Sequence, residues 1–400
     1  MAGITGLGTA FNLPNYTGEL FALTPEDTPL LSAIGGLTGG GQTTSTEFEW
    51  QTYDLRDPGQ RTKVEGADAP TAEERVRANV TNVVQIHQEK VSVSYTKQAA
   101  TGQLASPQAA PFNHPGGGPN PVTKELDWQV EQTLKSMALD VNWSFWNGQY
   151  VKPTTNASAR QTKGLLAAIT TNRIAKATTV TGATSATDTV TSTGHGLVDN
   201  DKIVFRNTGV ATNIVAGRVY YVDAIDANTF KVATSQGGTA LTLGTATGLS
   251  YVKPWSTTLT TDHVSDIIQM CYDNGGMSEQ FTATLAVNSK QKRAVTKAFA
   301  SAYGQFTETS RNVGGVNMTT IITDFGTLNV MLDRHLPQDM IVPVSLEQLM
   351  PVFLSIPDKG VFFEEPLAKT GASDNVQLYG EIGLKWGNER AHGVLEGLAV

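Results

Sequence analysis

The sequence predicts an α+β fold that carries a small all-β insertion. Three patterns predict it. Two strand-like runs near the start flank a long charged segment, a single long amphipathic helix follows, and shorter helices and strands alternate through the second half. Strands grouped apart from the long helix favour an α+β class over a regular α/β alternation.

Composition limits the classes of protein that fit. The chain has 400 residues, of which 40% are hydrophobic, so it can bury a large core and form more than one domain. Its net charge of -8 means that the chain as a whole repels phosphate. Charged residues make up only 16% of the chain, which is low for a free soluble protein. Such a surface suits a subunit that copies of itself largely cover.

The single cysteine, Cys271, excludes an intrachain disulfide and is expected to be a buried apolar residue in a reducing cytosol. No apolar run is long enough to cross a membrane. The first residues lack the basic start and apolar run of a signal peptide. We therefore expect no membrane partner and no secretion.

Residues 1–45 are expected to form an arm, because apolar residues are scattered without a helical period and Gly and Pro interrupt them. A short helix is expected after Thr24, since Pro25 suits a first helical position. The segment cannot build a core alone. Its Leu and Phe content favours an arm that lies on another surface.

Residues 46–96 are expected to form an extended hairpin loop. Phe48 and Trp50 alternate with polar residues, which is the period of a half-buried strand. A second run places Val91, Val93 and Tyr95 on one face. The connection from Asp54 to Asn79 is highly charged and almost lacks large apolar residues. A hairpin without its own core is marginal in water, so we expect a neighbouring subunit to support it.

Residues 97–172 contain the clearest helix of the chain. Thr123 is expected to cap it, and Glu125 and Asp127 lie in the favourable first turn. Asn147-Gly148 is the expected stop. Apolar residues recur every three or four positions in one stripe, which two tryptophans widen near the end: Leu126, Val130, Leu134, Met137, Val141, Trp143, Phe145 and Trp146.

Residues 173–254 are Thr-rich, with turn signals at short intervals, and are expected to form a small all-β domain. The flanking segments resemble continuous α/β chain once this module is removed. We therefore interpret it as an insertion into a surface loop, where insertions are tolerated.

The remaining chain alternates helices and strands. A helix near 263–276 places Val264, Ile267, Ile268 and Cys271 on one face. Asn288 is expected to cap the basic helix that follows it, and a hairpin is expected to turn at Asp324-Phe325-Gly326. Near the end, a strand places its apolar residues at even positions: Val376, Leu378, Ile382, Leu384 and Trp386.

The sequence does not favour an enzyme. A phosphate loop needs Lys where Gln42 stands, and the six histidines and lone cysteine form no zinc motif. Asp324-Phe325-Gly326 lacks the other kinase motifs, and no serine occupies a nucleophile elbow. Neighbouring carboxylates such as Glu364 and Glu365 point to opposite faces of a strand, so an acid/base hydrolase remains only the third interpretation. We expect no cofactor and no metal.

The order of arm, charged hairpin, spine helix and mixed α/β part resembles the tailed-bacteriophage major capsid fold of the Hong Kong 97 type. Local phrases resemble one branch of major head proteins: TPEDTPLLSAIG, TSTEFEWQTYDL, NSKQKRAV, EEPLAKTG and YGEIGLKWGNERAH. The resemblance covers nearly the whole chain except the insert. It implies a peripheral domain around the spine helix at 97–172, an axial α/β domain at 255–365 and a C-terminal strand region at 366–400 that returns to the peripheral domain.

The resemblance implies a structural protein that assembles into pentamers and hexamers of an icosahedral head around double-stranded DNA. Its implied partners are a portal, packaged DNA through non-specific contact, a decoration protein and a separate scaffold protein. The alternative to a separate scaffold protein is an N-terminus that has already been processed. Its implied location is the virion, with assembly in the host cytoplasm. The competing interpretation is another β-rich virion component, such as a tail-tube or decoration protein.

Two sets of residues follow as candidate contacts. The hairpin set is expected to form ion pairs between subunits: Arg56, Asp57, Arg61, Lys63, Glu65, Glu73, Glu74, Arg75 and Arg77. The second set makes one helix face basic: Lys290, Lys292, Arg293 and Lys297. That face is either a solvated helix surface or a contact with packaged DNA or an acidic patch on a neighbour.

Overall fold

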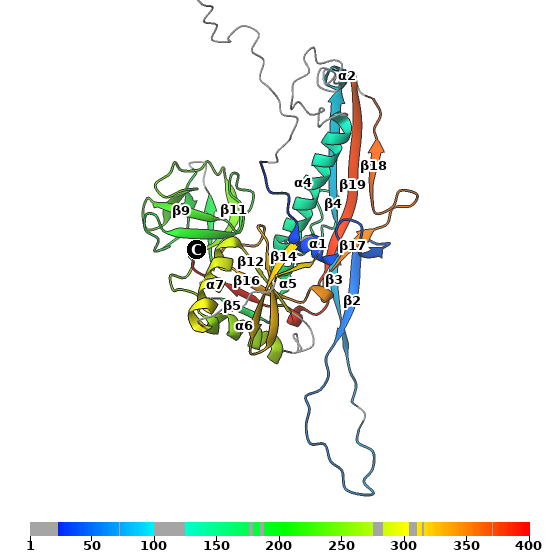
Figure 1. Cartoon of the computed structure of the whole chain (residues 1–400), viewed down its shortest axis with the longest axis vertical. Coiled ribbons are helices and arrows are strands. Elements are labelled where there is room, and N and C mark those ends of the chain that lie inside the picture. The colour runs from blue at the N-terminus through cyan, green and yellow to red at the C-terminus, as the bar shows by residue number, and fades with distance from the viewer. Residues whose placement is uncertain are drawn as a thin grey trace, which may run out of the picture. The chain divides into compact units, whose positions relative to one another are not determined.

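The structure is a computed structural model that describes residues 23–71, 73–99, 125–175, 179–184, 188–274, 283–303, 310–313, 316–369 and 371–400 (Figure 1). The chain divides into two compact units. The first unit holds the described parts of 1–26, 87–137 and 363–379, and the second holds those of 27–86, 138–362 and 380–400. Helix α4 (Glu125–Asn147) and strands β4 (Gln85–Ser94) and β19 (Ser373–Lys385) contribute residues to both.

In the first unit, β4 pairs with β19, and the edge strand β18 (Phe362–Pro366) flanks β19. Val91 and Val93 are buried as predicted. The expected alternation ends there, because Tyr95 is exposed and begins the short helix α2 (Tyr95–Ala99). The Tyr95 ring instead lies under the Lys369 ammonium, 5.3 Å from its centroid.

The second unit is built around a seven-stranded mixed sheet with the order β13-β14-β15-β12-β16-β20-β5. Its strands are β13 (Ser310–Val313), β14 (Val316–Thr323), β15 (Gly326–Leu332), β12 (Ala283–Val287), β16 (Ile341–Val344), β20 (Val394–Glu396) and β5 (Arg173–Ala175). The predicted hairpin is present, and its turn is Asp324 and Phe325, since Gly326 already pairs with Thr323 as the first residue of β15.

The two faces of this sheet contribute to two different cores. On β12, Leu285 and Val287 pack with helices α6 (Thr261–Asp273) and α7 (Ser289–Tyr303), whereas Ala286 joins the core that contains Trp146. The short helices α1 (Pro29–Ile34) and α5 (Leu165–Ala168) bury their leucines in that second core. Successive strand residues therefore alternate between two packed layers.

The sheet that holds β19 contributes Val352, Phe353, Ile382 and Leu384 to the core that contains Trp146. Strand β1 (Gly41–Thr43) runs parallel to β17 (Met350–Leu354), and β17 pairs antiparallel with the end of β19. The predicted apolar face of β19 is confirmed, because its even-numbered residues are buried: Val376, Leu378, Ile382 and Leu384, together with Trp386 just beyond the strand. Short 3-10 helices at Leu346–Gln348 and Glu389–Ala391 lie between β16 and β17 and between β19 and β20.

The predicted long helix and the helix that carries Cys271 are both present, as α4 and α6. Helix α4 ends at Asn147 as predicted, while Thr123, its expected cap, lies outside the described residues. Met137, Val141 and Phe145 are buried, whereas the first part of the predicted stripe is only half-buried. Burial within α6 raises the pKa of the Cys271 thiol to about 12, so this cysteine is a packing residue.

The arm helix begins later than predicted. Helix α1 starts at Pro29 rather than at Pro25, because Leu30 and Leu31 are the residues that enter the core. Pro25 lies in a segment without helix or strand, and Pro29 takes the first helical position instead. Asp27, just before α1, forms an ion pair with Arg334, and the distance from Arg334 Nε to Asp27 Oδ1 is 2.9 Å.

Strands from the predicted insertion close into a barrel in the order β10-β7-β6-β11-β8-β9. They are β6 (Thr179–Thr184), β7 (Val190–Thr191), β8 (Lys202–Asn207), β9 (Val219–Ala224), β10 (Thr229–Ala233) and β11 (Ala246–Val252). Phe205, Phe230 and Tyr251 fill its interior. Strand β5 does not join the barrel, since Arg173–Ala175 pairs in parallel with β20, so the barrel itself begins at β6.

An ion pair joins the barrel to the turn that precedes β16. Arg206 on β8 donates two hydrogen bonds to the fully buried Asp339, at 2.8 and 2.5 Å. Gly217 packs against Pro337 so closely that a Cβ atom there would lie 3.1 Å from it. A cavity of about 380 Å³ beside this joint is lined by Arg206, Arg173 and Glu396 among others. The bidentate pair fixes how the barrel meets the sheet.

Candidate assembly surface

The extended hairpin consists of two antiparallel strands and an open loop (Figure 1). Strands β2 (Glu47–Tyr53) and β3 (Arg77–Val83) pair along their whole length, from Glu47 with Val83 to Tyr53 with Arg77. The predicted alternation on β2 is confirmed, because Phe48 and Trp50 are buried while Glu49 and Gln51 are exposed. One face of the hairpin base is therefore packed against the rest of the chain, and the other faces solvent.

Aromatic contacts anchor this face. The Trp50 indole Nε1 donates a 2.7 Å hydrogen bond to the carbonyl of Gly387. Its ring meets Trp386 edge-on at 4.8 Å between centroids and stacks on Phe48 at 6.0 Å. Aromatic pairs in these geometries add about 0.5–1.5 kcal/mol beyond the area they bury.

A buried amide anchors the second strand. Asn82 is 0% exposed and donates from Nδ2 to Thr162 Oγ1 at 3.0 Å and to the Leu384 carbonyl at 2.7 Å. Its Oδ1 accepts from the backbone N–H of Lys163 at 2.9 Å. No pattern in the sequence signals this role, since an Asn in a polar-looking strand is normally solvated. These bonds fix the base of the hairpin to the body of the unit.

The loop from 54 to 76 has the opposite character. Its described residues form neither helix nor strand and are all exposed. They include apolar side chains, with Leu55 73%, Val64 79% and Val76 77% exposed. Single exposed apolar residues are ordinary, but these three lie on a loop that has no core of its own, which favours a partner that covers the loop.

The charged residues of the loop gather around one carboxylate. Glu73 accepts from Arg75 at 2.6 Å and from Arg56 at 3.0 Å, and Arg61 lies 3.5 Å away. Hydrogen bonds from Arg75 and Arg56 hold the pKa of Glu73 below its usual 4.5. Three guanidinium groups share one carboxylate, which leaves an excess of positive charge at this point.

The other residues of the predicted set are spread along the hairpin. Arg77 donates to the Gln51 side chain at 2.9 Å, and the Asp57 carbonyl accepts from Arg61 at 3.2 Å. Three further members are exposed on the loop: Lys63, Glu65 and Glu74. Within one chain, four of the nine residues therefore pair with one another around Glu73, and the expected ion pairs between subunits stay a prediction.

The predicted basic face lies on α7. Lys290, Arg293 and Lys297 are exposed, and Lys292 is half-buried. Partial burial and the neighbouring Lys202 of the barrel lower the pKa of Lys290. Two ammonium groups near each other favour an anionic partner. Asn288 precedes this helix, and its Nδ2 donates to the Leu336 carbonyl at 2.9 Å.

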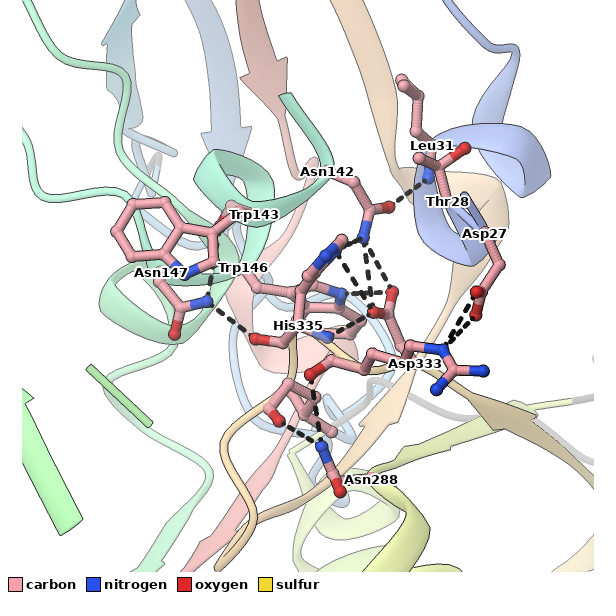
Figure 2. Close-up of polar contacts among 12 residues, drawn as sticks. Asp27, Thr28, Leu31, Asn142, Trp143, Trp146, Asn147, Asn288, Asp333 and His335 are labelled. Atoms are coloured by element: carbon pink, nitrogen blue, oxygen red, sulfur yellow. Dashed lines mark hydrogen bonds and ion pairs between the residues drawn. The ribbon is translucent and has the colours of Figure 1, made fainter. Parts of the chain in front are cut away.

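A buried polar cluster lies where α1, α4 and the loop after β15 meet (Figure 2). Asp333 is 0% exposed and accepts from the Trp146 indole at 2.8 Å and from the His335 backbone N–H at 2.8 Å. The Asn142 amide donates to both of its oxygens, at 3.3 and 3.1 Å. Several donors thus stabilise a carboxylate that is removed from water.

Chemistry of other kinds finds little support. Among the residues that the structure describes, no group of three or more His, Cys, Asp or Glu side chains could hold a metal ion. Within the same residues, no helix is long and apolar enough to cross a membrane. The base of the hairpin is fixed to its own chain, whereas the described residues of its loop are exposed.

Comparisons with known proteins identify the fold and the family. The capsid asymmetric unit of cyanophage A-1(L) is 10% identical and matches with a TM-score of 0.54, covering 100% of this chain and 99% of that chain. The capsid of Myoviridae phage XM1 is 12% identical, with a TM-score of 0.48 over 98% and 100% of the two chains. The SrpI encapsulin complex of Synechococcus elongatus is 8% identical, with a TM-score of 0.49 over 97% and 92%. A search of curated proteins found no match.

The fold is therefore that of a Hong Kong 97-type capsid subunit. The chain belongs to the SU10 major capsid protein family, whose model matches residues 3–399. It is a structural protein of the virion and not an enzyme, which confirms the resemblance and excludes the hydrolase and tail-tube interpretations.

Proposed function

We propose that this capsid protein assembles into the pentamers and hexamers of an icosahedral head around double-stranded DNA, and that the hairpin loop 54–76 binds a neighbouring copy. One observation carries the proposal for the loop. Its described residues are exposed throughout, including Leu55, Val64 and Val76, while the base of the same hairpin is anchored by Trp50 and Asn82.

The physical argument combines apolar area with charge. Covering apolar surface stabilises a contact by about 25 cal/mol per Å². Exposed ion pairs add only about 0–1 kcal/mol each, so strength comes from repeating the same contact around a shell. The arginines around Glu73 are already ordered within the loop, which lowers the entropy lost when a carboxylate of a neighbour joins them.

The basic face of α7 supports a second contact. Lys290, Arg293 and Lys297 are exposed on one helix, and Lys290 lies near Lys202. We propose that this face contacts packaged DNA or an acidic patch on a neighbour without reading sequence. The measurement is the slope of the logarithm of the DNA-binding constant of capsomers against the logarithm of salt concentration. Replacing these three residues by Ala should make this slope shallower by about 0.9 for each phosphate contact that is lost. An unchanged slope would exclude DNA.

Other partners follow from the role of a capsid subunit. We propose that a separate scaffold protein, a portal and a decoration protein associate with the shell, and that assembly takes place in the host cytoplasm. Co-purification of each partner with assembled particles, and not with the free subunit, tests this part.

The test of the loop replaces residues 54–76 by Asn-Gly, which suits a tight turn between β2 and β3. The expected product is a folded, soluble subunit that forms no shells by electron microscopy. Normal particles would refute the proposal.

A matched pair of variants separates the loop from exposure in general. Changing Leu55, Val64 and Val76 to Ser should lower the yield of shells about tenfold. Changing Val198, Val210 and Ile225 of the barrel to Ser alters side chains that are also exposed, at 62%, 79% and 53%, and should leave the yield unchanged. Equal losses in both variants would show that the loop has no special role.

A further inference from the structure

We infer that Asn142 is the residue that fixes helix α1 of the N-terminal arm to the capsid subunit, and that Asp333 positions its amide for this task. The contact joins residues that are 111 positions apart in the sequence. The Leu31 backbone N–H in α1 donates to Asn142 Oδ1 at 3.0 Å, and both residues are buried (Figure 2).

The bond matters because α1 has no cap of its own. Thr28 precedes the helix, and its side chain makes no capping hydrogen bond to the first turn. The first N–H groups of a helix have no partner within it. Asn142 on α4 therefore supplies from another element the acceptor that a capping side chain normally provides.

Asp333 determines which way the Asn142 amide faces. An amide that presented its NH₂ group to Leu31 would set two donors against each other. Because the Asp333 carboxylate accepts from Asn142 Nδ2 at 3.3 and 3.1 Å, the oxygen must face Leu31. His335 Nδ1 lies 2.8 Å from the same Nδ2 and accepts from it. Asp333 is thus a positioning residue that acts through Asn142.

Other contacts hold the same segment less specifically. Leu30 and Leu31 enter the core, and Asp27 pairs with the exposed Arg334. Apolar packing is tolerant of small rotations, whereas the Leu31–Asn142 bond requires one orientation of α1. The pair therefore fixes the orientation of α1 on the second unit.

The inference predicts that exchanging the two side chains restores the contact. Asn142→Asp alone sets two buried carboxylates against each other, and Asp333→Asn alone sets amide against amide and removes charge from the acceptor of Trp146. In the double variant N142D/D333N, the carboxylate introduced at position 142 accepts from Leu31 and from the amide introduced at position 333. Trp146 Nε1 and the His335 N–H donate to different oxygens of Asp333, whereas the introduced amide has a single oxygen. The double variant therefore restores the contact with Leu31 while one of these two donors loses its acceptor.

The experiment measures hydrogen exchange of the peptide 28–34 in the unassembled full chain. Each single variant should exchange about tenfold faster there than the original protein, and the double variant should return to within about threefold of it. Asn147→Ala is the control, because Asn147 lies on the same helix and donates to the His335 carbonyl at 2.9 Å without touching α1. It should leave exchange of this peptide unchanged.

Three outcomes would overturn the inference. The first is a double variant in which peptide 28–34 exchanges as fast as in the single variants. The second is an Asn147→Ala variant that speeds exchange of this peptide equally. The third is faster exchange at 28–34 only together with faster exchange of α6, which would indicate global unfolding. If the single variants do not fold, the double variant must still fold and protect α1. The consequence for shells rests on the proposed function, but anchoring is measured on single subunits, so the two can fail separately.

Discussion

The base and the loop of the hairpin are neighbours in sequence but differ in burial and in the partners of their polar groups. The base buries Trp50 and Asn82 and satisfies their polar atoms within the same chain. The loop exposes its described residues and pairs its charges mainly with one another around Glu73. The comparison teaches that one element can be fixed to its own subunit at one end and left open to another subunit at the other.

The largest expected effect is at the base. Asn82→Leu removes the partner of several buried groups, including the Leu384 carbonyl and the Lys163 N–H. We expect the free energy of unfolding to fall by about 3 kcal/mol or more. Chemical denaturation measures it. The control, Asn79→Leu, alters an exposed residue of the same strand and should change it by less than about 0.5 kcal/mol. Equal effects would mean that the base is not anchored as described.

The loop should be the first place where the free subunit is cut. Trypsin cleaves after Arg and Lys, and Arg56, Arg61, Lys63 and Arg75 lie in exposed chain without helix or strand. In the free subunit we expect cleavage here at least about tenfold faster than within β2 and β3, because backbone that needs no unfolding is cut directly. In assembled shells the same sites should be protected. Equal cleavage in both states would contradict a partner for the loop.

A smaller effect is expected for the tryptophan that anchors β2. Trp50→Phe keeps an aromatic ring but loses the hydrogen bond to Gly387, so the free energy of unfolding should fall by about 1–2 kcal/mol. Tyr53→Phe, on the exposed end of the same strand, should change it by less than about 0.5 kcal/mol. A neutral Trp50→Phe would show that the indole bond contributes nothing.

The smallest effect concerns the charge cluster of the loop. Glu73 should titrate below 4.5, and Arg75→Gln should move its pKa back toward that value, because Arg75 is the main cause of the shift. The lowered pKa sets the direction of the pH dependence. The ion pairs of Glu73 contribute to the stability of the folded chain above pH 4.5, and this contribution is lost as the pH falls through the lowered pKa. NMR titration of the Glu73 carboxyl carbon measures both. An unshifted pKa would mean that the arginines do not hold this carboxylate.

Periodic features of the fold could be predicted from the sequence. Phe48 and Trp50 are two residues apart, as on one face of a strand, and Val264, Ile267 and Cys271 recur at helical spacing. In each case the spacing alone predicts which side chains are buried. The barrel could be expected because short β-like runs and turns follow one another. In these cases neighbours in sequence carry the information.

Contacts between distant residues could not be predicted. Asn82, Asn142 and Asp333 are polar residues whose burial depends on partners far along the chain, and Asn142 and Asp333 are 191 positions apart. The start of α1 at Pro29 and the pairing of β5 with β20 also depend on what the rest of the fold buries. Single-sequence patterns record periodicity, whereas these features record tertiary complementarity.

The most direct test of the account is an electron cryo-microscopy structure of the assembled shell, inspected for what lies within about 4 Å of Leu55, Val64 and Val76. The account predicts side chains of a neighbouring copy around all three, with a carboxylate of that copy beside the arginines of the Glu73 cluster. A loop that faces solvent, or that folds back onto its own subunit, would contradict it.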